Sequence, residues 1–216
     1  MREIPDVVIG YVHPGTVRAE FMASVLATVM APRSRVASVT EVRSGPNISR
    51  ARNLLVSGFL REETAGWLWM LDTDMVFAPD ALDRLLAAAH ERDRPVVGAL
   101  CFAEHPEVPG GEPFATMYEP AEHGFAHYKL WPEDSVRRVA ATGAACLLVH
   151  RSVFGAVSAL MPGAAAPWFQ ETVEGDALIG EDMTFCLRAG AAGVPVHVHT
   201  GVQAGHMKTA MIGKVT

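Results

Sequence analysis

Two carboxylates, Asp72 and Asp74, follow directly on an apolar run and are separated by a single threonine. The run, 67–71, is typical of a buried strand, and ligands of open α/β sheets bind beyond the carboxyl ends of strands. Two unpaired carboxylates are costly to bury side by side, and a hard divalent cation such as Mg²⁺ or Mn²⁺ offsets that cost. The pattern therefore indicates a metal site that keeps open positions for phosphate oxygens. The alternative is a loop in which both Asp side chains bond backbone N–H groups.

A basic stretch, SRARN at 49–53, is the second set of residues that could do chemistry. It places Ser49, Arg50, Arg52 and Asn53 in the first turns of an expected helix. Helix N-termini favour anions, and an arginine can bind a phosphate through two hydrogen bonds. The stretch therefore predicts contacts to phosphate, with a solvated basic helix face as the alternative.

Two further groups lie late in the chain. Glu181 and Asp182 open an expected helix, where acids suit the helix dipole, so a capping role is an alternative to a catalytic one. His206 follows an expected strand, and an isolated histidine is often only structural. His197 and His199 share one face of that strand, but no third ligand at suitable spacing accompanies them, so a zinc site is not predicted.

The elements that must position these residues alternate between strands and helices. Strands are expected at 6–12, 35–42, 67–71, 95–100 and 195–199, and helices at 16–30, from 49 to about 60, at 80–90, 151–160 and 181–190. This alternation indicates a parallel α/β sheet with helices on both faces. After residue 100, the Pro- and Gly-rich stretch 104–113 indicates a mobile loop that is a candidate lid. Short strands at 114–118, 125–131, 136–140 and 145–149 are expected to form a small antiparallel addition.

The composition narrows the class of protein. The chain has 216 residues, half of them hydrophobic, and a formal net charge of −6, which argues against a broad basic face for nucleic acid. Its three cysteines form no CxxC pair, so neither a disulfide framework nor a thiolate zinc site is indicated. No apolar run approaches the ~20 residues of a membrane helix, and we expect a cytoplasmic protein of a bacterium or a phage-infected host.

Taken together and in this order, the motifs SRARN, LDTD, TGA, GED and GH resemble those of the GT-A glycosyltransferases, particularly the inverting family-2 type. The resemblance extends over nearly the whole chain, from VVIGYVHP to GHMK. It implies a GT-A, Rossmann-like α/β sheet in a single domain, 1–216, with a nucleotide-binding half at about 1–100 and an acceptor-side half at about 101–216. It also implies a hexosyltransferase or related enzyme of the compact, soluble kind that occurs in bacteria and their phages.

The resemblance assigns roles to individual residues. Asp72 and Asp74 match the DxD motif that holds Mn²⁺ or Mg²⁺ on the diphosphate of a nucleotide sugar, and His206 matches the histidine that completes the coordination. Asp182 matches the general base. The nucleotide side is expected to comprise His13, Pro14, Ser49, Arg50, Arg52, Asn53, Asp72 and Thr73, and the acceptor side Gly143, Trp168 and Glu181. A uridine diphosphate (UDP) sugar is the family's commonest donor. The acceptor is open among a glycan, a protein, a small molecule and a modified DNA base, and so is the oligomeric state.

Some features depart from the family's pattern. The second expected strand lacks the acidic pair that many relatives use for the nucleoside, although Glu41 is a possible substitute. No QxxRW follows the GED motif, so a processive polymerase is not expected. The alternatives are a non-catalytic nucleotide-sugar or glycan-binding module, a sugar-nucleotide pyrophosphorylase and a sugar-nucleotide hydrolase. The first loop, VHPGTV, lacks the glycine-rich, lysine-containing signature of a pyrophosphorylase, whereas the hydrolase stays open.

Overall fold

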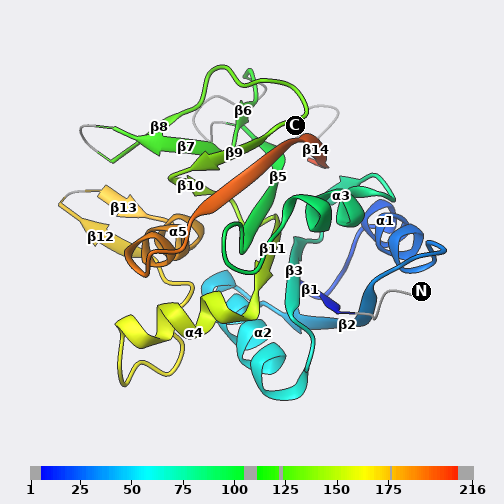
Figure 1. Ribbon diagram of the computed structural model, residues 1–216, viewed down its shortest axis with the longest axis horizontal. Helices are drawn as coiled ribbons and strands as arrows, with labels where there is room; N and C mark the ends of the chain where they lie inside the picture. Colours follow the sequence, from blue (N-terminus) through cyan, green and yellow to red (C-terminus); the bar gives the residue numbers. More distant parts are fainter. Residues whose placement is uncertain (1–5, 105–110, 122–123, 176, 209–216) are drawn as a thin grey trace, which may run out of the picture.

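The computed structural model describes residues 6–104, 111–121, 124–175 and 177–208 and has a mixed α/β sheet at its centre (Figure 1). Across this sheet the strands run in the order β2 (Val36–Arg43), β1 (Val7–His13), β3 (Trp67–Asp72), β11 (Cys146–His150), β5 (Val96–Ala103), β14 (Val196–His206) and β4 (Met75–Phe77), with β6 (Phe114–Ala115) on β5 and β9 (Val136–Val139) on β14. The pairs β1–β2, β1–β3 and β5–β14 are parallel. The sheet therefore has the parallel α/β core that the alternation of elements predicts.

Helices cover both faces of the sheet, as expected. Helices α1 (Ala19–Val29) and α3 (Ala81–Ala88) lie on one face, and α2 (Ile48–Glu62), α4 (Arg151–Leu160) and α5 (Glu181–Ala191) lie on the other (Figure 1). Strand β3 contributes to both cores: Leu68 and Met70 pack on the α2 side, and Trp69 and Leu71 pack on the α1 side. A strand covered on both faces is apolar throughout, which explains why 67–71 is a continuous apolar run.

The antiparallel additions differ in part from the expectation. Strands β10 (Ala141–Thr142), β7 (Met117–Pro120) and β8 (Phe125–His127) form a small sheet, and β12 (Thr172–Glu174) and β13 (Ala177–Ile179) form a hairpin before α5. The segment 145–149, expected in the addition, is instead strand β11 at the centre of the main sheet, antiparallel to both β3 and β5. Its residues 146–149 are buried, as a central position requires. The expected strand at 136–140 likewise joins the main sheet.

Two other expectations concern loops. The first helix is shorter than the expected 16–30, because α1 begins at Ala19 after Arg18 and Thr16 lies in the preceding loop. Most of the expected loop at 104–113 lies outside the described residues. Within the described ranges, no helix is long and apolar enough to cross a bilayer.

The last strand, β14, is longer than expected and changes partners along its length. It pairs with β5 up to His199, its register shifts before Gln203, and its end pairs with β4. The irregular segment is held by Arg84, which donates to the carbonyl of Gly201 and forms an ion pair with Asp134. After the shift β14 pairs with β5 again at Gln203 and Ala204, and its last residues also pair with β4, which places His206 opposite Met75.

Candidate active site

The two acids of the DTD motif lie on the turn that joins β3 to β4. Asp72 is the last residue of β3, and Asp74 immediately precedes Met75, the first residue of β4. The backbone N–H of Asp72 donates to the carbonyl of Ala145 at 2.9 Å, which ties the turn to the residue before β11. His206 lies opposite Met75 in the pairing of β14 with β4. The sheet thus brings the end of β14 to the DTD turn.

Asp74 and His206 form a close pair. His206 Nε2 lies 2.7 Å from Asp74 Oδ2, and Nδ1 lies 3.1 Å from the carbonyl oxygen of Phe102. Since a carbonyl oxygen can only accept, Nδ1 carries a proton. The bond with Asp74 raises the pKa of His206, although partial burial opposes its charge. Burial also opposes the ionised form of Asp74, but His206 and then Lys208 outweigh it and lower the pKa of this carboxyl.

These residues fit a divalent cation that is shared with substrate oxygens. With Nδ1 of His206 bonded to Phe102, Nε2 is the ring nitrogen left for a metal, and Asp74 supplies a carboxylate beside it. In the described part of the chain, no group of three or more His, Cys, Asp or Glu residues converges on a metal site. Asp72, expected as a third ligand, is instead bonded through both carboxylate oxygens to Arg52. A cation bound by two protein ligands takes the rest from phosphate and water.

Arg52 of α2 is buried at the centre of the site and binds acids from two other elements, β3 and α5. Its Nη2 donates to the two carboxylate oxygens of Asp72 at 2.8 and 3.0 Å, and its Nη1 donates to Glu181 at 2.5 Å and to Asp182. Only 2% of the residue is exposed. Burial opposes its charge, but Asp182, Asp72 and Glu181 together raise the pKa of Arg52 above its usual value. Arg52 is expected to bind phosphate, but these carboxylates occupy its guanidinium in the structure, and the contact to phosphate stays a prediction.

Asp182 lies in the first turn of α5, and each of its carboxylate oxygens has a partner. Oδ1 accepts from Arg52, and Oδ2 accepts from the backbone N–H of Ala144 at 3.0 Å. Burial raises the pKa of Asp182 to about 6, against the opposing effect of Arg52 and with further increases from Glu181 and Asp72. A carboxyl with this pKa accepts a proton more readily than an ordinary aspartate does, which suits a general base near neutral pH.

The side of Asp182 toward the small sheet has room beside the carboxylate. A Cβ added at Gly143 would lie 3.7 Å from Asp182 Oδ2 and 3.7 Å from Thr116 Oγ1, which is ordinary contact distance. Burial raises the pKa of Tyr118, and the nearby charge of Asp182 raises it further. Gly143 therefore lies beside the carboxylate, and Thr116 lies next to Gly143, on the side expected to receive the acceptor.

A pocket of about 430 Å³ lies on the other side of the DTD turn, a volume in the range of small-molecule sites. Four of the expected residues line it: Pro14, Asp72, Thr73 and Asp74. The other lining residues come from β1, the loop before α1, the loop after β2 and the start of α2: Val12, Thr16, Val17, Arg18, Ser44 and Ile48. We refer to this cavity as the donor pocket.

His13 and Glu41 lie beside one another at the ends of β1 and β2. His13 Nε2 is 3.8 Å from Glu41 Oε2, and His13 Nδ1 accepts from the N–H of Gly15 at 3.1 Å. Tyr11 donates to Glu41 at 2.8 Å, and burial followed by this bond raises the pKa of Tyr11 to about 12. Neither His13 nor Glu41 lines the donor pocket, although Val12 and Pro14, on either side of His13 in the chain, do.

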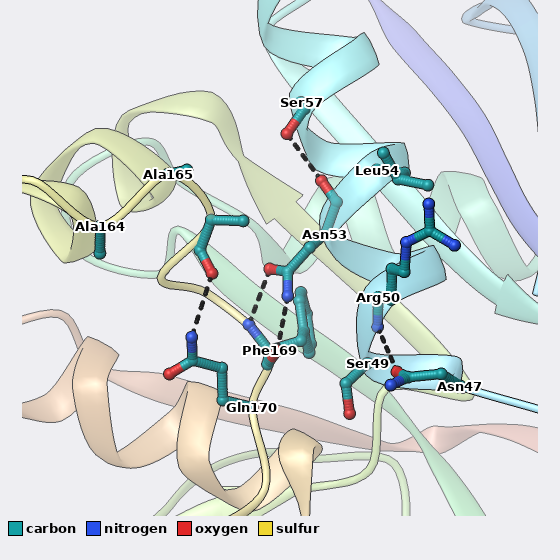
Figure 2. A pocket seen from close by; sticks show the side chains of 11 residues that line it. Asn47, Ser49, Arg50, Asn53, Leu54, Ser57, Ala164, Ala165, Phe169 and Gln170 are labelled. Atoms are coloured by element: carbon teal, nitrogen blue, oxygen red, sulfur yellow. Dashed lines mark hydrogen bonds between the residues drawn. The ribbon is translucent and has the colours of Figure 1, made fainter.

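The remaining residues from the start of α2 are placed differently from the expectation. Ser49, Arg50 and Asn53 line a second pocket, between α2 and the segment 164–170 (Figure 2). The side chain of Asn53 donates to the carbonyl of Phe169 at 2.6 Å and accepts from its N–H at 3.0 Å. Asn53 is therefore a structural clamp between the helix and this segment, and none of the three residues lines the donor pocket.

Trp168, expected on the acceptor side, belongs to the core. It is 5% exposed, and its indole N–H donates to the carbonyl of Phe154 at 2.9 Å. Its position is explained by packing, since a buried indole needs one hydrogen-bond acceptor and has one here.

The Asn53 clamp leads to a stability prediction. Replacing Asn53 with Leu keeps the size of the side chain but leaves the N–H and C=O of Phe169 without their partner in a buried setting. We expect the free energy of unfolding to fall by about 2–6 kcal/mol, from about 1–3 kcal/mol for each of the two buried unsatisfied groups. Urea denaturation followed by circular dichroism measures the loss. Ser57→Ala, which removes one bond to the carbonyl of Asn53 on the same helix, is the control, and an equally small loss in both variants would contradict the clamp.

Two features of the site were not anticipated from the sequence. Lys208 Nζ lies 2.8 Å from His206 Nε2, which brings an ammonium group to the Asp74–His206 pair. Arg18 and Ser44 line the donor pocket. A signal for Lys208 was present, since it follows His206 by two residues at the end of a strand, where alternate side chains share a face.

Comparison with known proteins supports the fold. No family model and no curated protein matches the sequence. The solved structures that are similar to this chain include A197 from STIV, with a TM-score of 0.61 and 17% identity over 94% of this chain and 86% of that one. They also include GalNAc-T7 with UDP, GalNAc and Mn²⁺, with a TM-score of 0.66 and 13% identity over 94% of this chain. The alignment spans 43% of the GalNAc-T7 chain. With its mixed sheet, flanking helices and small antiparallel sheets, the chain has the GT-A-like α/β fold that the sequence motifs predict.

Proposed function

We propose that the protein is a metal-dependent, inverting glycosyltransferase that moves a sugar from a nucleotide diphosphate to an acceptor hydroxyl. The observation that carries this proposal is the link through Arg52 between Asp72, in the wall of the donor pocket, and Asp182, beyond that pocket. A leaving-group site and a base are thereby held at a fixed separation, as an in-line displacement requires. A UDP sugar is the donor we propose, in keeping with the family resemblance and with the UDP and Mn²⁺ bound by GalNAc-T7.

Each side chain then has a task. Asp74 and His206 would hold the divalent cation, which would supply positive charge at the diphosphate. Lys208 adds a second positive charge beside it. Asp182 Oδ2 takes the proton of the acceptor hydroxyl, and Arg52 fixes the orientation of that carboxylate.

The first experiment is titration calorimetry with a panel of nucleoside diphosphates, first with Mn²⁺ and then with EDTA. We expect one nucleotide to bind in the presence of the metal and binding to be lost in EDTA. Asp74→Ala should abolish the metal-dependent binding because it removes one of the two protein ligands. Asp80→Ala is the matched control, since Asp80 is an exposed acid six residues further on whose side chain makes no capping bond.

Binding of no nucleotide under either condition would refute the proposal and favour a binding module. Hydrolysis of the donor uses the same residues with water as the acceptor. A product assay with the donor sugar and no acceptor distinguishes the two reactions, because only a hydrolase releases the free sugar at full rate in that assay.

A further inference from the structure

We infer that the pocket between α2 and the segment 164–170 is a second ligand site, for an apolar ring that carries an anionic group (Figure 2). We name it the α2 pocket. Its volume is about 490 Å³, and it shares no lining residue with the donor pocket. The proposed sugar transfer makes no use of it, so this inference goes beyond that function.

The walls of the α2 pocket are held in place by hydrogen bonds. Asn53 binds both backbone groups of Phe169. Gln170 Nε2 donates to the carbonyl of Ala166 at 3.5 Å, and Gln170 Oε1 accepts from Arg188 at 2.8 Å (Figure 2 shows the first of these). Because these bonds fix the segment against α2 and α5, the pocket is formed before any ligand arrives, which lowers the entropic cost of binding.

The surface of the α2 pocket is mostly apolar. The residues that give it this character are Leu54, Ala164, Ala165 and Ala166, whereas Phe169, which also borders the pocket, is fully buried. Leu54 is 49% exposed, although it lies on a helix whose neighbouring turns are well packed. A flat apolar ligand would cover this surface, and the burial would contribute roughly 25 cal/mol for each Å² removed from water.

Arg50 supplies a positive charge at this apolar surface. Figure 2 shows its side chain beside Leu54, which follows one turn later on α2. In the described part of the chain, no carboxylate lies within ion-pair distance of the Arg50 guanidinium, whereas that of Arg52 binds three acids. A guanidinium binds a carboxylate, sulfonate or phosphate through two hydrogen bonds and also stacks on aromatic rings. The occupant is therefore an apolar ring with an acidic group.

The α2 pocket is separate from the catalytic cluster but adjoins it. Phe169 lines the pocket, and its ring centroid lies 5.9 Å from the guanidinium carbon of Arg52. Arg52 in turn binds Asp182. Two side chains therefore stand between the occupant and the proposed base, which places the occupant outside the transfer reaction itself.

The test uses 8-anilinonaphthalene-1-sulfonate, an apolar aromatic sulfonate whose fluorescence rises on binding, titrated into the full chain. We expect one saturable site, weakened at least roughly tenfold in Arg50→Ala, since the variant loses a charge-assisted hydrogen bond to the sulfonate. Arg61→Ala is the matched control: Arg61 is an exposed arginine on the same helix that pairs with Glu62, and its replacement should not change the affinity. Ala165→Trp, at an exposed position of the pocket wall, should block binding.

The inference is overturned if no saturable binding occurs, or if Arg50→Ala and Ala165→Trp bind the dye as the unmodified protein does. Displacement of the dye by UDP with Mn²⁺ would also overturn it, because the dye would then occupy the donor pocket. Each readout is of binding alone, so its failure is distinct from a failure of the sugar-transfer proposal.

Discussion

Replacement of Asp182 by Asn is expected to lower the rate of sugar transfer by about 10²–10⁴-fold, the usual contribution of a general base. The amide of Asn has nearly the same shape as the carboxylate but cannot take a proton from the acceptor. Nucleotide binding should be retained, because Asp182 is not part of the wall of the donor pocket. Transfer is measured as product formation with the donor identified by calorimetry, and binding by the same calorimetry.

The dependence of transfer on pH provides a second measurement of the same role. Because burial raises the pKa of Asp182 to about 6, its base form is populated only above that pH. The rate of transfer by the unmodified protein should therefore rise as the pH increases through about 6 and then level off. In Asp182→Asn, this rise should be absent from the residual rate.

Glu181→Gln is the matched control, since it removes one negative charge from the neighbouring residue, which also binds Arg52. It should lower transfer far less than Asp182→Asn, because Glu181 makes no bond to Ala144. If both variants lose the same activity, the effect arises from disturbing Arg52 and Asp182 is not the base. If Asp182→Asn retains nearly full transfer, Asp182 is not the general base.

The parts of the site that sequence motifs predict best are those formed by short, continuous segments. Asp72-Thr73-Asp74 ends a strand, and the fold places it in the wall of a pocket because the carboxyl end of a parallel strand opens on a crevice. His206 was matched only through the resemblance. Its approach to Asp74 depends on the pairing of the end of β14 with β4, which lies beyond the expected strand at 195–199.

The residues at the start of α2 were predicted less well, because they lie on different faces of the helix. Ser49, Asn53 and Ser57 are four residues apart and share one face, which lines the α2 pocket. Arg52 lies instead on the face of Leu55 and Phe59, the buried face of the helix. Treating 49–53 as one phosphate-binding motif overlooked this periodicity. The periodicity alone indicates a buried arginine that requires acidic partners.

The position of β11 shows a further limit of local patterns. An apolar run of five residues after several short strands was assigned to the antiparallel addition. The run instead lies in the main sheet between β3 and β5. Between β5 and this run, the chain also forms strands β7, β8 and β10 of the separate small sheet. Local sequence determines that 146–150 is a strand, whereas its partners depend on contacts with segments far away in the chain.

Arg52→Met is expected to be the most damaging change to the fold of the site. It removes the buried cation that compensates Asp72, Glu181 and Asp182, and breaking a buried ion pair from one side costs about 3–5 kcal/mol of unfolding free energy. Transfer should fall at least as far as in Asp182→Asn, because the base and the wall of the donor pocket lose their common support. Arg61→Met, on the exposed face of the same helix, should change stability by less than about 0.5 kcal/mol.

The pH dependence of the stability loss in Arg52→Met distinguishes the effect of the missing charge from the effect of the missing packing. Without Arg52, the three carboxylates repel one another, so they bind protons more readily in the folded protein than in the unfolded chain. A group whose pKa is raised on folding stabilises the fold at low pH, and its contribution is lost as the pH rises through the folded-state pKa. The destabilisation by Arg52→Met should therefore be smaller at pH 5 than at pH 8, measured by urea denaturation at both. Equal losses at both pH values would mean that Arg52 acts through its volume, and the charge-based account of the site would be wrong.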